Sequence, residues 1–476
     1  TYTFICCPRQ HRTEMTRKIR RRQIIRGIGA AGIAGLAGCT GNGDGGDGGD
    51  GGDGGDGGDG DDGGSTPTPE GTPTSTPEST PTETEAMTDT GGDGGASRTI
   101  KVGILMGVTG GLSELGPPIR DAAQLAADYM DEESDTFSID YQFEDTATDP
   151  NTGIPNAEAL VNAGYPAIAG ALSSTVTIQV ANNVTVPNGI VQCSPASTSP
   201  AITTLEDNDY LYRTTPTDAL QSQVMVQVGQ ERLGGSSTAI LALNNDYGQG
   251  LADAYAENWE AAGGTVQNRV NFEAEQGSYT SQLATVLQDQ PDVMMVVGYP
   301  ASGVQIFRDF YNDYSQDFCD IIVPDGLQSQ DLPGNVGNSM RNVWGTAPAS
   351  VGPGRDTFDS LYQDAYDADP AESPFTAQSF DAVAVLALAN AAAGENTGSA
   401  IRDQMNAVAN EGGETVTPDN LAEGLEMAAN GTEINYQGAA GTIQFDDAGD
   451  IAAATYQLYR YQEGGFENID QIDFSA

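Results

Sequence analysis

The chain has 476 residues, enough for more than one domain, with 68 acidic against 19 basic residues and a formal net charge of −49 at pH 7. Such a surface repels nucleic acid, which proteins bind through a basic face, so this class of partner is excluded. The single histidine, His11, lies near the N-terminus, so the rest of the chain cannot form a Ser–His or Cys–His nucleophile pair or a histidine-ligated zinc site. We therefore expect a protein that is not an enzyme and holds no cofactor or metal.

The first 38 residues have the pattern of an export signal. Basic residues at 20–26 precede a Gly- and Ala-rich run at 27–38 that is too short to span a bilayer as a helix. The arginines followed by Gln and two isoleucines resemble a twin-arginine signal, and we expect Met15 to be the true start. Leu-Ala-Gly-Cys at 36–39 resembles a lipobox. Cys39 is therefore predicted to carry a lipid that anchors the protein on the extracellular face of the cell membrane.

Residues 39–98 are predicted to form a linker without a core. Gly-Gly-Asp repeats occupy 43–62, and a Thr-, Pro- and Glu-rich stretch continues to about residue 85. Neither composition supplies enough apolar surface to fold. The many carboxylates and the single lysine after Cys39, Lys101, are typical of haloarchaeal proteins. In multimolar salt, charge repulsion is screened over roughly 3 Å and becomes tolerable.

From residue 99 onward, strands and helices alternate. The expected strands are 99–106, 137–144, 167–171, 189–193, 238–243, 266–272, 293–297 and 321–324, and the expected helices are 119–132, 154–162, 174–184, 248–262, 279–288 and 302–314. This alternation predicts βαβ units with parallel sheets. Because the rhythm occurs twice, the predicted fold is α/β, with two doubly wound parallel-sheet lobes. Ligands of such sheets bind at the carboxyl ends of the strands, here in a cleft between the lobes.

Five short motifs follow one another in this region. They are Ile-Lys-Val-Gly-Ile-Leu at 100–105 with Thr-Gly at 109–110, Ser-Ser-Thr at 173–175, Ser-Pro-Ala-Ser-Thr-Ser-Pro at 194–200, Tyr-Arg-Thr-Thr-Pro at 212–216 and Asn-Asn-Asp-Tyr-Gly-Gln-Gly at 244–250. In this order and spacing they resemble the leucine/isoleucine/valine-binding family of type I periplasmic binding proteins. That family supplies the solute-binding lipoproteins of ABC importers.

The resemblance implies two lobes joined by a three-segment hinge. Lobe one comprises 99–216 plus 347–449, lobe two comprises 217–346 plus 450–476, and the crossings lie near Thr215, Thr346 and Gly449. It also implies a monomer that closes on a small-molecule ligand, an amino acid of branched-chain type or a related carboxylate or amide, and delivers it to ABC permease subunits. A receptor of the same fold that feeds a signalling partner is the alternative.

On the side of lobe one, four residues are candidate ligand contacts. Ser173 and Ser174 stand where a strand gives way to a helix, and hydroxyls with free N–H groups there attract a carboxylate. Ordinary N-capping is the structural alternative. The resemblance implies that Ser173 binds the ligand's carboxylate. It also implies that Ala196, through its backbone, and Thr198, through its hydroxyl, bind the ligand's α-amino and α-carboxylate groups. For these two the alternative is a plain structural turn.

On the side of lobe two, the candidates are Tyr247, Tyr299 and Asp325. The resemblance implies that both tyrosines close over the ligand, the alternative being half-buried surface residues. It places an acid at Asp325 to meet the ligand's ammonium, although the family often has the longer Glu, and solvent exposure is the alternative. Leu115 stands where the family often has an aromatic residue, which weakens the expectation of a branched-chain ligand.

Two further features have structural interpretations. Cys193 and Cys319 are expected to be buried free thiols, with a disulfide between them as the alternative. The acidic segment 446–450 lacks the spacing of an EF-hand and is expected to be a structural turn.

Overall fold

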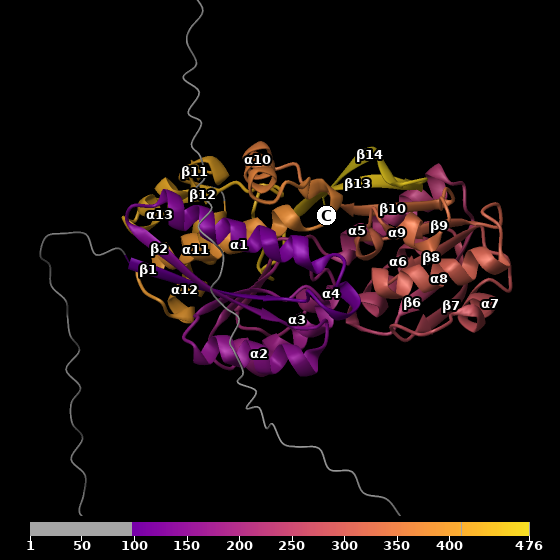
Figure 1. The fold of residues 1–476 in the computed structure, drawn as a ribbon, viewed down its shortest axis with the longest axis horizontal. Coiled ribbons are helices and arrows are strands. Elements are labelled where there is room, and N and C mark those ends of the chain that lie inside the picture. Colours follow the sequence, from indigo (N-terminus) through magenta and orange to yellow (C-terminus); the bar gives the residue numbers. More distant parts are fainter. Residues whose placement is uncertain (1–97, 411, 476) are drawn as a thin grey trace, which may run out of the picture. The chain divides into compact units, whose positions relative to one another are not determined.

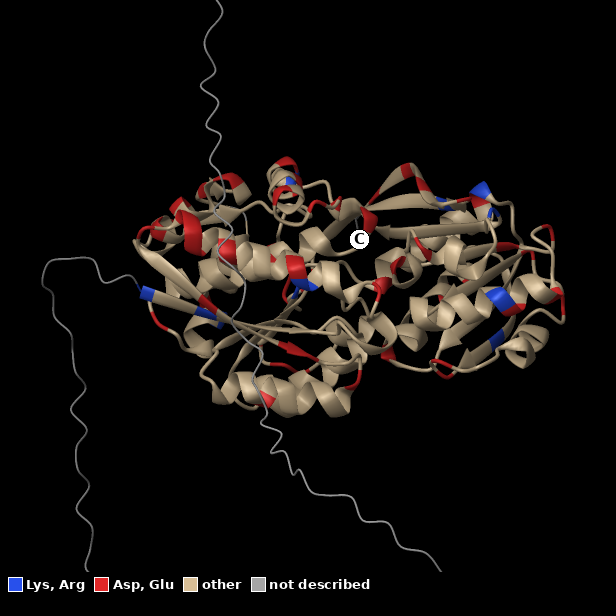
Figure 2. Cartoon of the chain, in the orientation of Figure 1, with Lys and Arg blue, Asp and Glu red and all other residues tan. Residues whose placement is uncertain are grey.

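The computed structural model describes residues 98–410 and 412–475. The predicted signal, Cys39 and nearly all of the linker lie outside these residues. In the part of the chain that is described, no helix combines the length and apolar character needed to cross a membrane. Acidic residues are spread over both halves of this part, with few basic ones among them (Figure 2).

Lobe one is built on a five-stranded, all-parallel sheet in the order β2-β1-β3-β4-β5. Its strands are β1 (Arg98–Met106), β2 (Phe137–Asp145), β3 (Ala167–Gly170), β4 (Val191–Ser194) and β5 (Leu211–Arg213). Its early helices are α1 (Gly116–Glu133), α2 (Pro150–Asn162), α3 (Ser174–Val180) and α4 (Pro200–Thr203). Helices α2 and α3 lie on one face of the sheet and α1 on the other (Figure 1).

Lobe two is built on a seven-stranded sheet in the order β14-β13-β10-β9-β8-β6-β7. Its strands are β6 (Ser237–Leu243), β7 (Thr265–Phe272), β8 (Val293–Val297), β9 (Asp320–Val323), β10 (Val343–Pro348), β13 (Ala453–Gln462) and β14 (Gly465–Ser475). Its helices are α5 (Asp218–Gln227), α6 (Asp246–Ala261), α7 (Thr280–Val286), α8 (Pro300–Asp313) and α9 (Leu332–Val336). Strand β8, Val-Met-Met-Val-Val, is buried throughout, as a central parallel strand must be.

The sheet of lobe two is not purely parallel, which differs from the prediction. The chain re-enters it with β13 antiparallel to β10, and β14 then turns back along β13 as a hairpin. A hairpin needs only a short turn, whereas a further parallel strand needs a long crossover.

Between β10 and β13 the chain returns to lobe one. The elements there are α10 (Arg355–Tyr366), α11 (Thr376–Ala393), α12 (Gly398–Ala409), β11 (Glu414–Val416), α13 (Leu421–Ala429) and β12 (Ile434–Tyr436). Helix α11 is buried along nearly its whole length because α1, α12 and α13 pack around it. The sequence analysis assigned no element after residue 324, so all of these are new.

The expected strands and helices up to residue 324 are confirmed, with shifted ends. The first helix begins at Gly116 because Pro117 and Pro118 fit its first turn. The helix expected at 174–184 ends in a wider π turn, Ala181–Thr185. Cys193 and Cys319 are free and buried, so the expectation of free thiols is confirmed.

Candidate ligand-binding cleft

The carboxyl ends of β3 and β4 in lobe one face those of β6, β8 and β9 in lobe two across a narrow cavity. From lobe one it is lined by Leu112, Leu115, Ile119, Leu172, Ser174, Ala196 and Phe375, and from lobe two by Tyr247, Tyr299, Asp325 and Gly326. Its volume is about 20 Å³, which is room for about one water molecule. An amino acid therefore enters only when the lobes move apart.

Ser173 and Ser174 lie at the turn between β3 and α3, as predicted. Ser173 has the extended backbone of an N-cap residue, but its side chain caps nothing, so the capping alternative does not apply to it. Its hydroxyl instead accepts a hydrogen bond from Tyr299 of lobe two at 3.4 Å. The Ser174 hydroxyl accepts one from the backbone N–H of Ser199 at 3.3 Å. The Ser173 hydroxyl therefore contacts lobe two, and Ser174 lines the cavity between the lobes.

Ala196 and Thr198 belong to a rigid turn after β4. The Ser194 hydroxyl accepts from the Ser197 N–H at 3.0 Å, which folds the turn back on the strand. Ala196 lines the cavity, and Thr198 is completely buried. The Thr198 hydroxyl has no hydrogen-bond partner, an uncommon and costly state for a buried hydroxyl. The turn is thus structural, and it also presents an unpartnered polar atom.

Tyr247 and Tyr299 form the wall of lobe two. Their rings stack with centroids 5.5 Å apart, and both side chains are buried, so the half-buried surface alternative is wrong. The Tyr247 hydroxyl donates to Asp325 Oδ2 at 3.5 Å and accepts from the Gly326 N–H at 3.3 Å. Burial raises the pKa of Tyr299 to about 12, so its hydroxyl remains a donor at neutral pH.

Asp325 follows β9 and opens a short 3₁₀ turn, Asp325–Leu327. Only 2% of its surface is exposed, so the solvent-exposed alternative is wrong. Its Oδ1 atom has no partner, and burial raises the pKa of its carboxyl. A carboxylate in this position is stabilised by any cation that reaches it.

The sequence analysis missed a second buried acid, Asp218, at the start of α5. Its backbone N–H donates to the carbonyl oxygen of Thr198 at 2.8 Å, which places it beside the turn after β4. Neither of its carboxylate oxygens accepts a well-aligned hydrogen bond, although the Thr198 hydroxyl and the charge of Arg213 lie near enough to act on it. Burial raises the pKa of Asp218 well above its usual range, the charge of nearby Asp325 raises it further, and Thr198 and Arg213 partly oppose this rise. The signal was an Asp directly after the crossing motif 212–216, in a stretch to which no element had been assigned.

The apolar residues that line the cavity were also missed, except for Leu115. Leu112, Ile119, Leu172 and Phe375 complete it. Phe375 has a left-handed backbone, with φ at 65°, a strained conformation for a large side chain that tends to occur at ligand sites. Leu112 could have been recognised as a cavity residue from its place in the first loop, which follows β1. Nothing in the sequence distinguishes Phe375.

Direct contacts join the lobes around the cavity. The Asp246 N–H donates to the Thr175 hydroxyl at 3.0 Å, and the Ser199 hydroxyl donates to the Asp246 carbonyl oxygen at 2.9 Å. On the other side, Ser329 bonds to Glu114. These contacts describe a closed arrangement.

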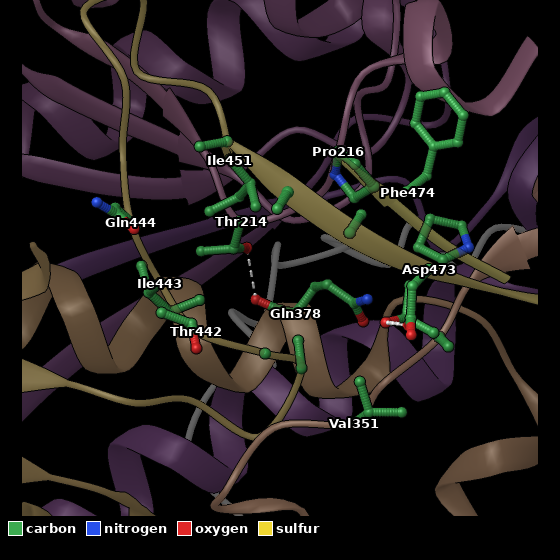
Figure 3. Close-up of a pocket in the computed structure, with 18 of the residues that line it drawn as sticks. Thr214, Pro216, Val351, Gln378, Thr442, Ile443, Gln444, Ile451, Asp473 and Phe474 are labelled. Atoms are coloured by element: carbon green, nitrogen blue, oxygen red, sulfur yellow. Dashed lines mark hydrogen bonds between the residues drawn. The ribbon is translucent and has the colours of Figure 1, made fainter. Parts of the chain in front are cut away.

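A larger cavity, of about 500 Å³, lies among the segments that connect the lobes (Figure 3). Thr214 and Pro216 from one crossing, Pro348 from a second and Ile451 from a third contribute to it. The Thr214 hydroxyl donates to the Gln378 carbonyl oxygen at 2.8 Å within it. None of the predicted contact residues lines this space, so the candidate site is the smaller cavity in the cleft.

Two α/β lobes with a polar and apolar cavity enclosed between them define a solute-binding protein. A family model described as "Periplasmic binding protein" matches residues 99–465, so this chain belongs to the periplasmic binding protein family. The family and the type I fold predicted from the five motifs are therefore confirmed.

Two relatives show the range of roles in proteins similar to this chain. The Leu/Ile/Val-binding protein BraC3 of Rhizobium johnstonii is 23% identical over 78% of this chain and 93% of its own length. The chemotactic signal transduction system substrate-binding protein BasB of Halobacterium salinarum is 24% identical over 69% of this chain and 78% of its own length.

Solved structures share the fold. LivJ of Streptococcus pneumoniae, in complex with isoleucine, superimposes with a TM-score of 0.65 at 20% identity, covering 80% of this chain and all of LivJ. A solute-binding protein of Rhodopseudomonas palustris, in complex with 3,4-dihydroxybenzoic acid, gives 0.63 at 19% identity, covering 79% of this chain and 98% of that protein.

Proposed function

We propose that this protein binds an amino acid of branched-chain type in the cleft and delivers it to the permease of an ABC importer. The observation that carries the proposal is the mixed lining of the cavity. It combines hydroxyls and the buried carboxylate of Asp325 with four aliphatic side chains and Phe375. A zwitterion with an apolar side chain is complementary to such a lining.

In this proposal each candidate has one task. Ser173 and Ser174 hold the ligand's carboxylate, and Ala196 and Thr198 orient its α-amino and carboxylate groups. Asp325 meets the ammonium, and Tyr247 and Tyr299 close over the ligand. The role of BraC3 as a Leu/Ile/Val-binding protein and the isoleucine bound by LivJ support the ligand class. The aromatic acid bound by the Rhodopseudomonas protein is the competing class.

Thermal unfolding of the mature protein in multimolar KCl tests this function. Leucine, isoleucine or valine at 100 times the dissociation constant should stabilise the fold by about 2.7 kcal/mol. 3,4-Dihydroxybenzoate at the same concentration is the matched control and should give no shift. A shift with the aromatic acid alone would refute the amino-acid ligand and keep the solute-binding role.

The second candidate is a receptor that reports the bound solute to a signalling partner. The similarity to BasB, a substrate-binding protein of a chemotactic system, favours it. Deleting the gene separates the two roles. Loss of uptake of the labelled amino acid supports import, whereas normal uptake with lost chemotaxis towards it supports sensing.

We further propose that the protein acts as a monomer on the extracellular face of the membrane, held by a lipid on Cys39 and a linker over 39–98. The export pattern at 1–38 and the lipobox support this location. The proposed lobe boundaries are 99–216 plus 347–449 and 217–346 plus 450–476. Replacing Cys39 with Ser should release the protein into the medium, and a variant that stays in the membrane fraction would refute the anchor.

A further inference from the structure

The sequence contains two segments of the form Asn-X-Thr, at 183–185 and 430–432. This pattern is the acceptor for N-linked glycosylation, in which a sugar is joined to the side-chain amide of the Asn. The transferring enzyme must reach both the Asn amide and the Thr hydroxyl. The surroundings of these two groups in the folded protein therefore distinguish a usable acceptor from an unusable one.

The segment 430–432 lies in an exposed turn. Asn430 is the C-cap of α13, Gly431 has the left-handed backbone that such a turn requires, with φ at 75°, and Asn430, Gly431 and Thr432 are all exposed. The Gly431 N–H donates to the Ala428 carbonyl oxygen at 3.1 Å, and the Thr432 N–H donates to that of Met427 at 3.0 Å. Within the described residues, the Asn430 amide group and the Thr432 hydroxyl form no side-chain hydrogen bond, so both groups are available.

The segment 183–185 is enclosed instead. It belongs to the π turn that follows α3, where the Asn183 amide donates to the Gln179 carbonyl oxygen at 2.7 Å. Val184 and Thr185 are completely buried, and the Thr185 hydroxyl donates to Gln192 Oε1 in β4 at 2.8 Å. An enzyme reaches this hydroxyl only if part of the core of lobe one unfolds.

The turn at 430–432 also lies away from the cleft. The hydroxyl of Thr136, directly before β2, donates to Glu426 Oε1 at 2.5 Å, which places the last turn of α13 beside the amino end of β2. The cleft borders the opposite, carboxyl ends of the strands. Figure 1 likewise shows α13 on the side of lobe one that faces away from lobe two. A bulky group on Asn430 therefore leaves closure of the lobes unobstructed.

We propose that Asn430 carries an N-linked glycan and that Asn183 does not. The amide nitrogen of Asn430 bonds to the anomeric carbon of a sugar that is carried on a lipid phosphate. The bond between that carbon and the phosphate oxygen breaks, the phosphate leaves with the electron pair, and a base of the transferring enzyme takes one amide proton. The inference rests on the proposed extracellular location and on export in the folded state, which presents only the protein surface to that enzyme.

Mass spectrometry of the protein isolated from its own cells tests the inference. The peptide that contains 430–432 should be heavier than its sequence by at least one sugar, with the added mass on Asn430, and the peptide that contains 183–185 should have the mass of its sequence. Asn430→Gln and Thr432→Ala, expressed in the same cells, should remove the added mass. Thr432→Ser keeps the hydroxyl and should retain it.

Asn183→Gln is the matched control and should leave the added mass on Asn430 in place. Asn430→Gln should keep the melting temperature of the folded protein nearly unchanged, because the Asn430 side chain forms no hydrogen bond that the substitution could break. Loss of the added mass in that variant then reports the missing acceptor and not a misfolded protein.

Three results would overturn the inference. These are protein in the membrane fraction with Asn430 unmodified, added mass on the 430–432 peptide that persists in Thr432→Ala, or a glycan on Asn183. The first result keeps the proposed location and refutes only the glycan. Protein recovered solely from the cytosol, with Asn430 unmodified, would refute the location as well.

Discussion

The buried charges of this protein fall into two kinds, those satisfied by the chain and those left open. Arg213 and Asp450 are of the first kind and form a fully enclosed ion pair. Asp450 of this pair belongs to the segment 446–450, for which the sequence analysis expected a structural turn, and Arg213 ends β5. Asp218 and Asp325 are of the second kind. The difference separates a charge pair that stabilises the fold from acids whose oxygens are left open, of which Asp325 is proposed to meet a ligand, and it is visible only in the contacts.

Arg213→Met should destabilise the fold strongly. The substitution leaves Asp450 buried without a charged partner and removes the donors to the carbonyl oxygens of Ser197 and Ser199, which costs about 3–5 kcal/mol of the free energy of unfolding. Urea unfolding measures the loss. Arg269→Met, which breaks an exposed pair with Asp253, is the control and should change stability by about 1 kcal/mol or less. Equal effects of the two variants would contradict the distinction.

At the scale of elements, the sequence predicted strands and helices where buried residues recur at a regular spacing along the chain. Most strands up to residue 324 were predictable because each is a short apolar run between turns, whereas β5 (Leu211–Arg213), which is only three residues long and ends in arginine, was missed. The antiparallel return of β13 and β14 was not, since strand direction depends on where the chain re-enters the sheet. Phe375 was unpredictable for a related reason, because its left-handed backbone is imposed by its surroundings. Asp218 became recognisable as a buried acid only in the structure.

Gly250, in the first half of α6, limits how closely the lobes meet. A Cβ atom there would lie 2.9 Å from Ser199 Oγ and 3.0 Å from Pro200 Cδ, both in lobe one. Gly250→Ala should therefore favour the open arrangement, seen as a larger radius of gyration in X-ray scattering of the unliganded protein. Gly334→Ala, where a Cβ meets nothing within 4 Å, is the control. An unchanged radius in both variants would show that this contact does not limit closure.

At the scale of the molecule, the open carboxylates make stability depend on pH and ligand together. Their pKa values are raised in the folded state, so their contribution is fully present below the unfolded value of about 4 and is lost as pH rises through the folded values. The other titratable groups around the pair are Arg213, which binds Asp450 and whose charge also partly opposes the raised pKa of Asp218, and Tyr247, Tyr299, Tyr456 and Tyr459, whose raised pKa values keep them neutral.

The melting temperature of the unliganded protein should accordingly fall between about pH 4 and pH 7, and saturating leucine should flatten this fall. Asp218→Asn should flatten it without ligand. Scanning calorimetry at constant high salt measures all three curves. A wild-type curve that rises over this range, with or without leucine, would contradict this role of the two acids.

The cavity of about 500 Å³ among the connecting segments (Figure 3) has a mechanical consequence. Tightly packed interiors resist bending, because side chains must move past one another. Here the crossings border free space, so they can flex with little repacking. The resistance to opening then comes mainly from the contacts of Glu114, Thr175 and Ser199 across the cleft. The connecting segments themselves oppose the motion only weakly.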